Sequence, residues 1–330
     1  MKYKVALITG GYSGEAEVSY KSAKNVAANL DESSYDVYTI DIRQEGWFHT
    51  EDNGVVHEID RKDFSINIAG NKINFDVAFI ILHGTPGEDG KLQGYFDMIG
   101  LPYTSCNAAT SALTFNKRYT VAVAAFSGIH VAKSVHLIKG FEWDAGIIAS
   151  QLRMPVFVKP NNGGSSIGMS KINDQKDLSD AIEKAFQVDD QVLVEEMIKG
   201  REFTIGVYLH KNQVKVLPIT EVKAHEGQSF FDYEAKYLGK SDEITPAQVT
   251  EDIKNKIENA ARHIYEVFNC NGVIRIDFIY QDEEKVPYML EINTVPGQSN
   301  ASIIPQQVRA SGQMLKDFYG NLIEEVLRHK

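Results

Sequence analysis

The chain has 330 residues, of which 43% are hydrophobic and 24% are charged, and its formal net charge is −11. This composition is typical of a folded globular protein, and the length predicts two or three domains of about 100–200 residues each. The acidic balance argues against nucleic acid as a general partner, because phosphate binding needs a basic surface. No apolar run reaches the roughly 18–20 residues of a membrane helix, and the N-terminus resembles a strand rather than a signal peptide, so we expect a cytoplasmic protein without membrane contact.

The first hundred residues alternate between strand-like and helix-like patterns. Strands are predicted at 4–8, 37–40 and 77–82, and a helix at 18–30. This alternation indicates an α/β (α+β) fold with a parallel sheet at its N-terminal end. Functional groups gather at the carboxyl ends of parallel strands, which makes Glu15 and His83 candidate site residues. The plainer interpretations are a carboxylate that complements a helix dipole and a structural histidine.

A glycine- and serine-rich segment, residues 159–168, follows a predicted strand at 155–159. Glycines let the backbone approach a ligand closely, successive N–H groups can surround a phosphate, and Lys159 adds a positive charge. An ordinary hairpin turn is the alternative, and the segment lacks the ending of a Walker A loop. The next strand, 192–198, has a backbone edge that could pair with adenine, and Glu202 after it could accept from ribose hydroxyls; the alternative is a connector with surface acids.

Residues 227–245 form a polar, aromatic-bearing stretch without clean periodicity. Long irregular segments inside enzymes often serve as lids or binding loops. Lys236 and Tyr237 lie here, and the two interpretations are a loop anchored by aromatics and a lid that closes over phosphates.

The most informative feature is a pair of apolar runs at 272–279 and 286–291. Alternation places Arg275 and Asp277 on one face of the first strand, and Glu291 and Asn293 on one face of the second. If the strands pair as a hairpin, three oxygen ligands and one guanidinium converge. Carboxylate and amide oxygens suit Mg²⁺, which also takes nucleotide phosphates, whereas the alternative is a set of solvent-facing acids. The hairpin therefore predicts a nucleotide–magnesium site.

Together these segments resemble the D-alanine–D-alanine ligase family of the ATP-grasp superfamily, in the right order over nearly the whole chain. The motifs that carry the resemblance lie at residues 10–19, 82–94, 100–104, 159–170, 232–237, 275–277 and 291–297. The resemblance implies a three-domain ATP-grasp architecture, with an N-terminal domain at 1–107, a central subdomain at 108–196 and a C-terminal subdomain at 197–330. It also implies a cytoplasmic homodimer that uses ATP and two Mg²⁺ (or Mn²⁺) ions to join two D-alanine molecules through a D-alanyl phosphate, for peptidoglycan precursors.

The resemblance further implies roles for matching residues. Contacts with ATP would come from Lys117, Lys159, Glu195, Ile198, Glu202 and Lys236. The metal ions would be held by Asp277, Glu291 and Asn293. The first D-alanine would meet Glu15 and His83, the second would meet Ser302 and Ile303, and Arg275 with the Gly297 N–H would stabilise the oxyanion. In the family, Tyr237 of the lid meets Ser165, which in turn meets Glu15.

Some positions depart from the family pattern. Ala16 replaces a larger polar or basic residue, Asn116 replaces an acid before Lys117, and Gln298 to Ala301 replace a commoner loop that starts with Phe or Met followed by Thr. The Lys236–Tyr237 pair predicts D-alanine as the preferred acceptor. The alternatives are a related ligase with another amino or hydroxy acid acceptor such as D-lactate, a nucleotide-binding module without catalysis, and a dinucleotide-dependent oxidoreductase.

Overall fold

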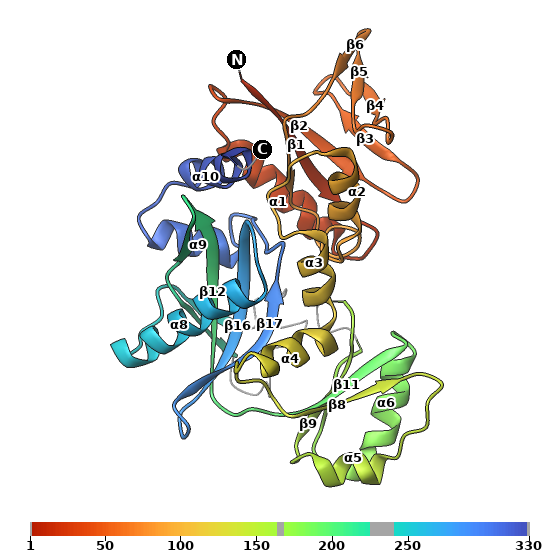
Figure 1. Cartoon of the computed structure of the whole chain (residues 1–330), viewed down its shortest axis with the longest axis vertical. Helices are drawn as coiled ribbons and strands as arrows, with labels where there is room; N and C mark the ends of the chain where they lie inside the picture. The colour runs from red at the N-terminus through yellow and green to blue at the C-terminus, as the bar shows by residue number, and fades with distance from the viewer. Residues whose placement is uncertain (1, 164–167, 225–240, 329–330) are drawn as a thin grey trace.

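The computed structural model describes residues 2–163, 168–224 and 241–328. Within them, no helix combines the length and the apolar composition that crossing a lipid bilayer requires. Figure 1 shows the N-terminal unit at one end of the molecule, the C-terminal sheet in the middle, and the central unit at the other end.

The N-terminal unit is built on a sheet with strand order β4-β3-β2-β1-β7. Its elements are β1 (Tyr3–Gly10), α1 (Ala16–Asn29), β2 (Tyr35–Ile42), β3 (Trp47–Thr50), β4 (Val56–Glu58), β5 (Ile66–Ile68), β6 (Asn71–Ile73), β7 (Val77–Ile80) and α2 (Lys91–Ile99). β1 pairs in parallel with both β2 and β7, as predicted. β3 and β4 extend this sheet with antiparallel pairs through short turns, so the sheet as a whole is mixed.

The central unit is a four-stranded antiparallel sheet with order β10-β9-β11-β8. Its elements, with the two helices that lead into it, are α3 (Ala108–Phe115), α4 (Lys117–Phe126), β8 (Ser134–Ile138), α5 (Ala145–Gln151), β9 (Val156–Pro160), β10 (Ser170–Ile172), η1 (Gln175–Asp177), α6 (Leu178–Phe186) and β11 (Gln191–Glu196). Asn116 is the N-cap residue directly before α4, and its side chain accepts a hydrogen bond from the Tyr119 N–H. An amide at this position therefore serves as the helix cap.

The C-terminal unit has a sheet with order β15-β14-β12-β16-β17, and β13 pairs with β12. Its elements are β12 (Arg201–His210), β13 (Gln213–Val216), β14 (Thr220–Ala224), β15 (Ser241–Ile244), α8 (Glu251–Val267), β16 (Val273–Gln281), β17 (Val286–Asn293), α9 (Ile303–Ala310) and α10 (Leu315–Arg328). The stretch 227–245, which we predicted to be irregular, ends in β15, which pairs with β14. Pairing with β14 thus makes residues 241–244 a strand, although their polar sequence showed no strand periodicity. Residues 225–240 lie outside the described residues.

The final helix, α10, packs between the N-terminal unit and the C-terminal sheet, because it contacts α1 and β7 as well as β12 (Figure 1). Phe318, Tyr319 and Leu322 of this helix are fully or almost fully buried in one core with Val5 and Ile8 of β1. A separate core fills the central unit, and its buried members all lie between Leu137 and Val194. The N- and C-terminal units therefore share a core, whereas the central unit has its own.

Candidate active site

The hairpin β16–β17 brings the predicted metal and oxyanion residues together. The two strands pair antiparallel, with Arg275 opposite Asn293 and Asp277 opposite Glu291. A register shift follows directly after Asp277. Because side chains alternate along each strand, all four functional groups lie on the same face of the sheet. The predicted convergence is confirmed.

Asp277 is the most strongly bound of these groups. Its carboxylate accepts two hydrogen bonds from Arg275, at 2.8 Å from Nε and 2.7 Å from Nη2, and one at 2.5 Å from the Thr204 hydroxyl. Thr204 lies directly opposite Asp277 on β12. The Arg275 guanidinium is also 3.7 Å from Glu291. Two carboxylates thus share one fixed cation, which leaves an excess of negative charge on this face.

The donor set fits Mg²⁺. Asp277 is 8% exposed, and the Asn293 Nδ2 atom is buried with no hydrogen-bond partner among the described residues. The oxygen and nitrogen of an amide occupy nearly equivalent positions, so Asn293 can present its oxygen there instead. Two carboxylates and one amide oxygen are hard ligands of the kind that Mg²⁺ takes together with phosphate oxygens.

Most of the predicted substrate residues line one cavity of about 460 Å³ together with the hairpin. Predicted site residues on its wall are Glu15, His83, Lys117, Glu202, Arg275, Asp277, Glu291, Asn293, Gly297, Ser302 and Ile303. They come from all three units of the chain, since Lys117 opens α4, Glu15 precedes α1, and Glu202 lies on β12. The cavity is therefore the point at which the three units meet.

The loop after β7 supplies two titratable groups whose pKa values are shifted. His83 is 7% exposed, and burial lowers its pKa to about 4, helped by the positive charge of Arg275 and opposed by a hydrogen bond with the Val295 backbone. Burial and the negative charge of Glu15 raise the pKa of Glu88 to about 8, although Glu88 accepts a 2.7 Å hydrogen bond from the Gly84 N–H. Glu15 lies against the same loop, because a Cβ on Gly84 would stand 2.7 Å from its Oε2 atom. An electrically neutral histidine and a proton-holding acid thus flank Glu15.

The loop after β17 presents a compact set of donors. A Cβ on Gly297 would lie 2.9 Å from Ser302 Oγ, so only glycine leaves this backbone open without displacing the serine. Ser302 Oγ accepts a 3.0 Å hydrogen bond from the Ser299 N–H and lies 2.7 Å from Ser299 Oγ. Because two groups can donate to the Ser302 oxygen, its own hydroxyl hydrogen is available to an anion.

The nucleotide residues of the central unit are arranged differently from the prediction. Lys159 on β9 forms an ion pair with Glu195 on β11, and neither residue lines the cavity, nor does Ile198 in the loop that follows. Lys117 is closer to the glycine-rich segment, since its Nζ donates a 2.6 Å hydrogen bond to the Gly163 carbonyl. The amine that we predicted for phosphate therefore neutralises the acid that we predicted for adenine.

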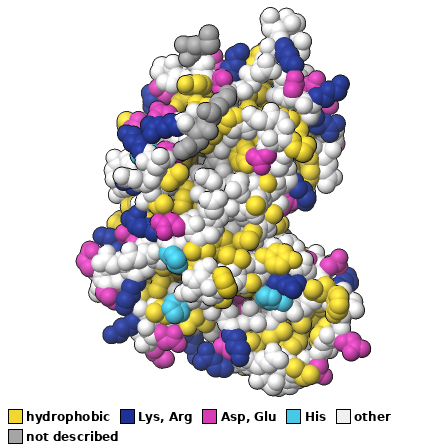
Figure 2. All heavy atoms as spheres, viewed as in Figure 1, with side chains coloured by type: hydrophobic (Ala, Val, Ile, Leu, Met, Phe, Trp, Pro, Cys, Tyr) yellow, Lys and Arg dark blue, Asp and Glu magenta, His cyan; other side chains and the backbone are white. Residues whose placement is uncertain are grey.

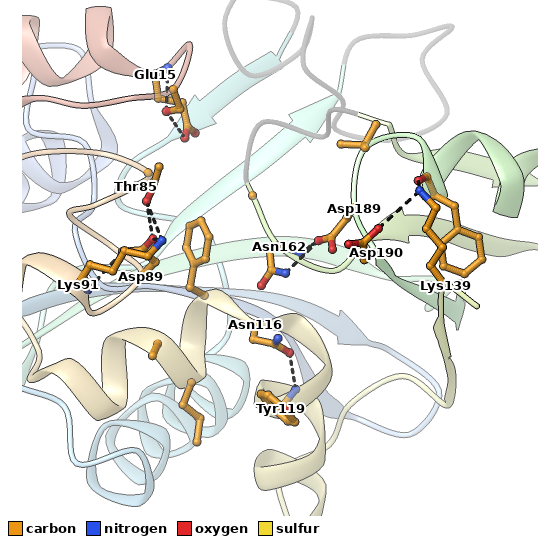
Figure 3. Close-up of a pocket in the computed structure, with 18 of the residues that line it drawn as sticks. Glu15, Thr85, Asp89, Lys91, Asn116, Tyr119, Lys139, Asn162, Asp189 and Asp190 are labelled. Carbon is orange, nitrogen blue, oxygen red and sulfur yellow. Dashed lines mark hydrogen bonds and ion pairs between the residues drawn. The ribbon is translucent and has the colours of Figure 1, made fainter. Parts of the chain in front are cut away.

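A wider cleft of about 990 Å³ lies between Glu15 and Thr85 of the N-terminal unit and Asn162 and Asp189 of the central unit. Figure 3 shows Glu15 and Thr85 on one wall, Asn162 and Asp189 on the opposite wall, and Asn116 of α4 along the base. The surface is hollowed between the N-terminal and central units in Figure 2, with hydrophobic side chains gathered over α3 and α4. Glu15 and Gly163 line both this cleft and the smaller cavity, so the two spaces are continuous.

Three predicted residues, Ser165, Lys236 and Tyr237, lie outside the described residues. The structure in turn adds residues that sequence reasoning missed, namely Glu88, Thr204 and Ser22. Glu88 carried a signal, because an acid inside a glycine-rich loop next to an apolar strand tends to be desolvated. The local sequence gives no sign of the roles of Thr204 and Ser22, because their hydrogen-bond partners Asp277 and His83 are distant in sequence.

Known proteins resemble the chain along its whole length. The protein-family model described as "D-ala D-ala ligase N-terminus" matches residues 4–106, and the family model described as "D-ala D-ala ligase C-terminus" matches residues 116–324. The D-alanine–D-alanine ligase of Flavobacterium johnsoniae is 45% identical over 97% of this chain and 98% of its own.

Among solved structures, the VanG D-Ala:D-Ser ligase of Enterococcus faecalis is 32% identical, with a TM-score of 0.87 over 98% of this chain and 99% of its own. A D-alanine–D-alanine ligase from Bacillus anthracis, complexed with ATP, is 26% identical, with a TM-score of 0.79 over 99% of this chain and 98% of its own. The predicted ATP-grasp fold is confirmed by these neighbours. The chain belongs to the D-alanine–D-alanine ligase family.

Proposed function

We propose that the chain joins two D-alanine molecules in an ATP-dependent reaction that yields D-alanyl-D-alanine, ADP and phosphate. The observation that carries this proposal is the single cavity that holds Glu15, Arg275, Asp277 and Ser302 together. Family membership supports it, because the curated relatives at 41–45% identity are D-alanine–D-alanine ligases over almost their full length. A binding module without catalysis would not need an oxyanion donor beside a metal-type donor set.

Each wall of the cavity fits one part of the reaction. Glu15 would bind the ammonium group of the first D-alanine, with neutral His83 nearby. The carboxylate of this first D-alanine attacks the γ-phosphate of ATP. The attack releases ADP and leaves an acyl phosphate. The amine of the second D-alanine, once deprotonated, attacks the acyl carbon, and phosphate departs as the amide bond forms. Arg275 and the Gly297 N–H would stabilise the oxyanion that develops on the acyl oxygen.

The nucleotide would lie between the hairpin and the central unit. Lys117 and Lys159 would contact its phosphates, Glu195 and the backbone near Ile198 its adenine, and Glu202 its ribose. We propose the same family roles for Ser165, Lys236 and Tyr237. Asp277, Glu291 and Asn293 would hold two Mg²⁺ ions (or Mn²⁺), which, when bound, supply positive charge that offsets the phosphate oxygens. On nucleotide binding, Lys159 would exchange its ion pair with Glu195 for a phosphate oxygen.

The direct test is incubation of the chain with ATP, Mg²⁺ and D-alanine, followed by assays for ADP and by mass analysis of the product. Parallel reactions with D-lactate and D-serine as competing acceptors define the acceptor. We expect D-alanyl-D-alanine as the main product. A dominant depsipeptide with D-lactate, or D-alanyl-D-serine as the main product of an equimolar mixture, would refute the assignment of the acceptor.

The metal assignment has its own test. Asn293→Ala should raise the Mg²⁺ concentration needed for half-maximal turnover and leave the melting temperature nearly unchanged, because Asn293 Nδ2 has no partner to lose among the described residues. Asn53→Ala, which changes an exposed turn, is the matched control. Isothermal titration of Mg²⁺ in the presence of a non-hydrolysable ATP analogue provides a measurement that is independent of activity. Unchanged Mg²⁺ affinity in Asn293→Ala would contradict the assignment.

We also propose a cytoplasmic homodimer that serves peptidoglycan precursor synthesis, since the reaction consumes ATP. One feature that supports self-association is the outer face of α4, where Phe126 is 94% exposed and Tyr119 is 51% exposed. From Met98 to Phe141 the sequence contains no Asp or Glu, so two acidic chains would repel one another least on this side. Light scattering after size exclusion measures the mass, and Phe126→Glu should shift it toward the monomer.

A further inference from the structure

Gln298 lies in the loop between β17 and α9, which also contains Ser302, and it is only 1% exposed. Its neighbours Gly297 and Ser299 line the cavity, together with Ser302, whereas Gln298 does not. The side chain therefore points away from the substrates and into the protein. This position is also where the chain departs from the Phe or Met that is commoner in the family.

Two residues of α1 hold the backbone of Gln298. Its N–H donates a 3.0 Å hydrogen bond to Ser22 Oγ, and its carbonyl accepts a 2.7 Å hydrogen bond from Asn25 Nδ2. Since the Ser22 oxygen accepts this bond, its single hydrogen can be donated to His83 Nε2, 3.2 Å away. The loop of the C-terminal unit is thus fixed at both sides of one residue by a helix of the N-terminal unit.

The side chain of Gln298 is held from a third direction. The hydroxyl of Tyr319, a fully buried residue of α10, donates a 3.2 Å hydrogen bond to Gln298 Oε1. Asn25 Nδ2 lies 3.5 Å from the same hydroxyl as a donor, so the tyrosine hydrogen is directed at Gln298. Buried polar groups that hydrogen-bond to one another define one arrangement of the chain more strictly than apolar packing does, although Gln298 Nε2 has no partner among the described residues.

These contacts determine where the Ser302 hydroxyl lies. Ser299, the next residue after Gln298, donates its N–H to Ser302 Oγ, and the two hydroxyl oxygens are 2.7 Å apart. A shift of Gln298 would move Ser299 and with it the orientation of the Ser302 hydroxyl. A small displacement of this donor would weaken its bond to a substrate carboxylate, because hydrogen bonds depend steeply on angle.

We propose that Gln298 is a positioning residue for the acceptor D-alanine, acting through Ser299 and Ser302, and that Asn25 and Tyr319 are parts of the same device. The inference rests on the proposed role of Ser302 toward the acceptor carboxylate. It assigns to this chain a polar anchor where a hydrophobic side chain is commoner. It also makes acceptor affinity depend on residues of α1 and α10 that do not line the cavity.

The test compares Gln298→Met, Tyr319→Phe and the double variant with the wild-type chain. Methionine keeps the length and volume of glutamine but accepts no comparable hydrogen bond, and phenylalanine removes one oxygen. Rates of ADP release over a wide range of D-alanine concentrations, fitted with separate donor and acceptor constants, give the two KM values. We expect the acceptor KM to rise about tenfold in each single variant, as for one lost polar contact of about 1.4 kcal/mol. The donor KM, the ATP KM and kcat should stay within about twofold, and the double variant should resemble the single ones.

Tyr265→Phe is the matched control, because it removes another buried tyrosine hydroxyl, one that donates a 2.8 Å bond to the Gly272 carbonyl away from this loop. It should lower the melting temperature comparably and leave the acceptor KM unchanged. Gln298→Met with an unchanged acceptor KM, or with all three KM values raised together, overturns this inference and leaves the proposed function standing. A wild-type chain that forms no dipeptide overturns both this inference and the proposed function.

Discussion

The hairpin and the proposed nucleotide residues of the central unit rest on different cores. The hairpin with Arg275 and Asp277 packs on the core of the C-terminal sheet, and that sheet also contributes to a second core, shared with the N-terminal unit, whose members include Phe318 and Val5. Lys159 and Glu195 belong to the central unit, whose core contains only its own residues. The groups proposed for bond making thus lie on a frame formed by both ends of the chain, whereas the proposed nucleotide residues lie on a sheet that has a core of its own.

The shared core explains why the frame is fixed. Helix α10 places Tyr319 against Phe79 of β7 and Phe318 against Tyr208 of β12, and its Lys316 forms a 3.0 Å ion pair with Asp31 after α1. Helices α3 and α4, which lead into the central unit, pack against the sheet of the hairpin, and the Met289 N–H donates a 2.8 Å bond to the His130 carbonyl. The pairing of Lys159 with Glu195 lies within the central sheet, and we propose that nucleotide binding exchanges this pair for phosphate contacts.

The largest effect should come from breaking the shared core. Phe318→Ala should lower the free energy of unfolding by about 3–5 kcal/mol, and Ile182→Ala in the central core by about 2–5 kcal/mol. The two changes should differ in what unfolds. Hydrogen exchange should show β1, β16 and β17 losing protection together in Phe318→Ala, and only residues between 134 and 196 doing so in Ile182→Ala. Uniform loss of protection in both variants would show that the cores are not separate.

The frame can also be tested through its chemistry. Arg275→Ala should lower kcat about 10²–10³-fold, equivalent to about 2.7–4 kcal/mol, because one preorganised oxyanion donor is lost. The control is Arg201→Ala, since Arg201 is another partly buried arginine of the same sheet and lies 2.8 Å from the carboxylate of Glu221. If the two variants lose activity equally, Arg275 contributes only to the structure.

The hairpin could be predicted from the sequence because its signal is local. Apolar runs with period two place Asp277 and Glu291 on one face whatever surrounds them, and pairing across a short turn brings them opposite each other. The position of α10 could not be predicted, because its partners in α1 and β7 lie more than two hundred residues earlier, and an amphipathic pattern does not indicate which surface the helix covers. The Lys159–Glu195 pair was missed for a different reason. It depends on the pairing of β9 with β11, which are separated by β10 and α6 in the sequence.

In the central unit, we expect Lys159→Ala to raise the KM for ATP about tenfold to a hundredfold, which corresponds to a loss of about 1.4–2.8 kcal/mol of binding free energy. A point charge that reaches the phosphates would be lost, while both D-alanine KM values should change less than about twofold. Lys171→Ala on the neighbouring strand β10 is the control. Equal increases in all three KM values would mean that Lys159 supports the central sheet rather than ATP.

The smallest effect concerns Glu88, which lies on the fixed side of the cleft. Its pKa is raised from 4.5 to about 8 in the folded chain, so the folded state holds a proton that the unfolded state has released between these values. The free energy of unfolding should therefore fall as pH rises from 4.5 to 8. Glu88→Gln keeps an acceptor for the Gly84 N–H and cannot ionise, and we expect it to remove this slope and to stabilise the chain by about 1–2 kcal/mol at pH 8, since Glu88 is partly exposed. Urea unfolding at pH 7.5 and 8 measures the slope in a window above the ordinary histidine pKa of 6.5, where His83 is almost entirely neutral in both states. A slope that persists in Glu88→Gln would assign the pH dependence to another group and would leave Glu88 ionised beside Glu15.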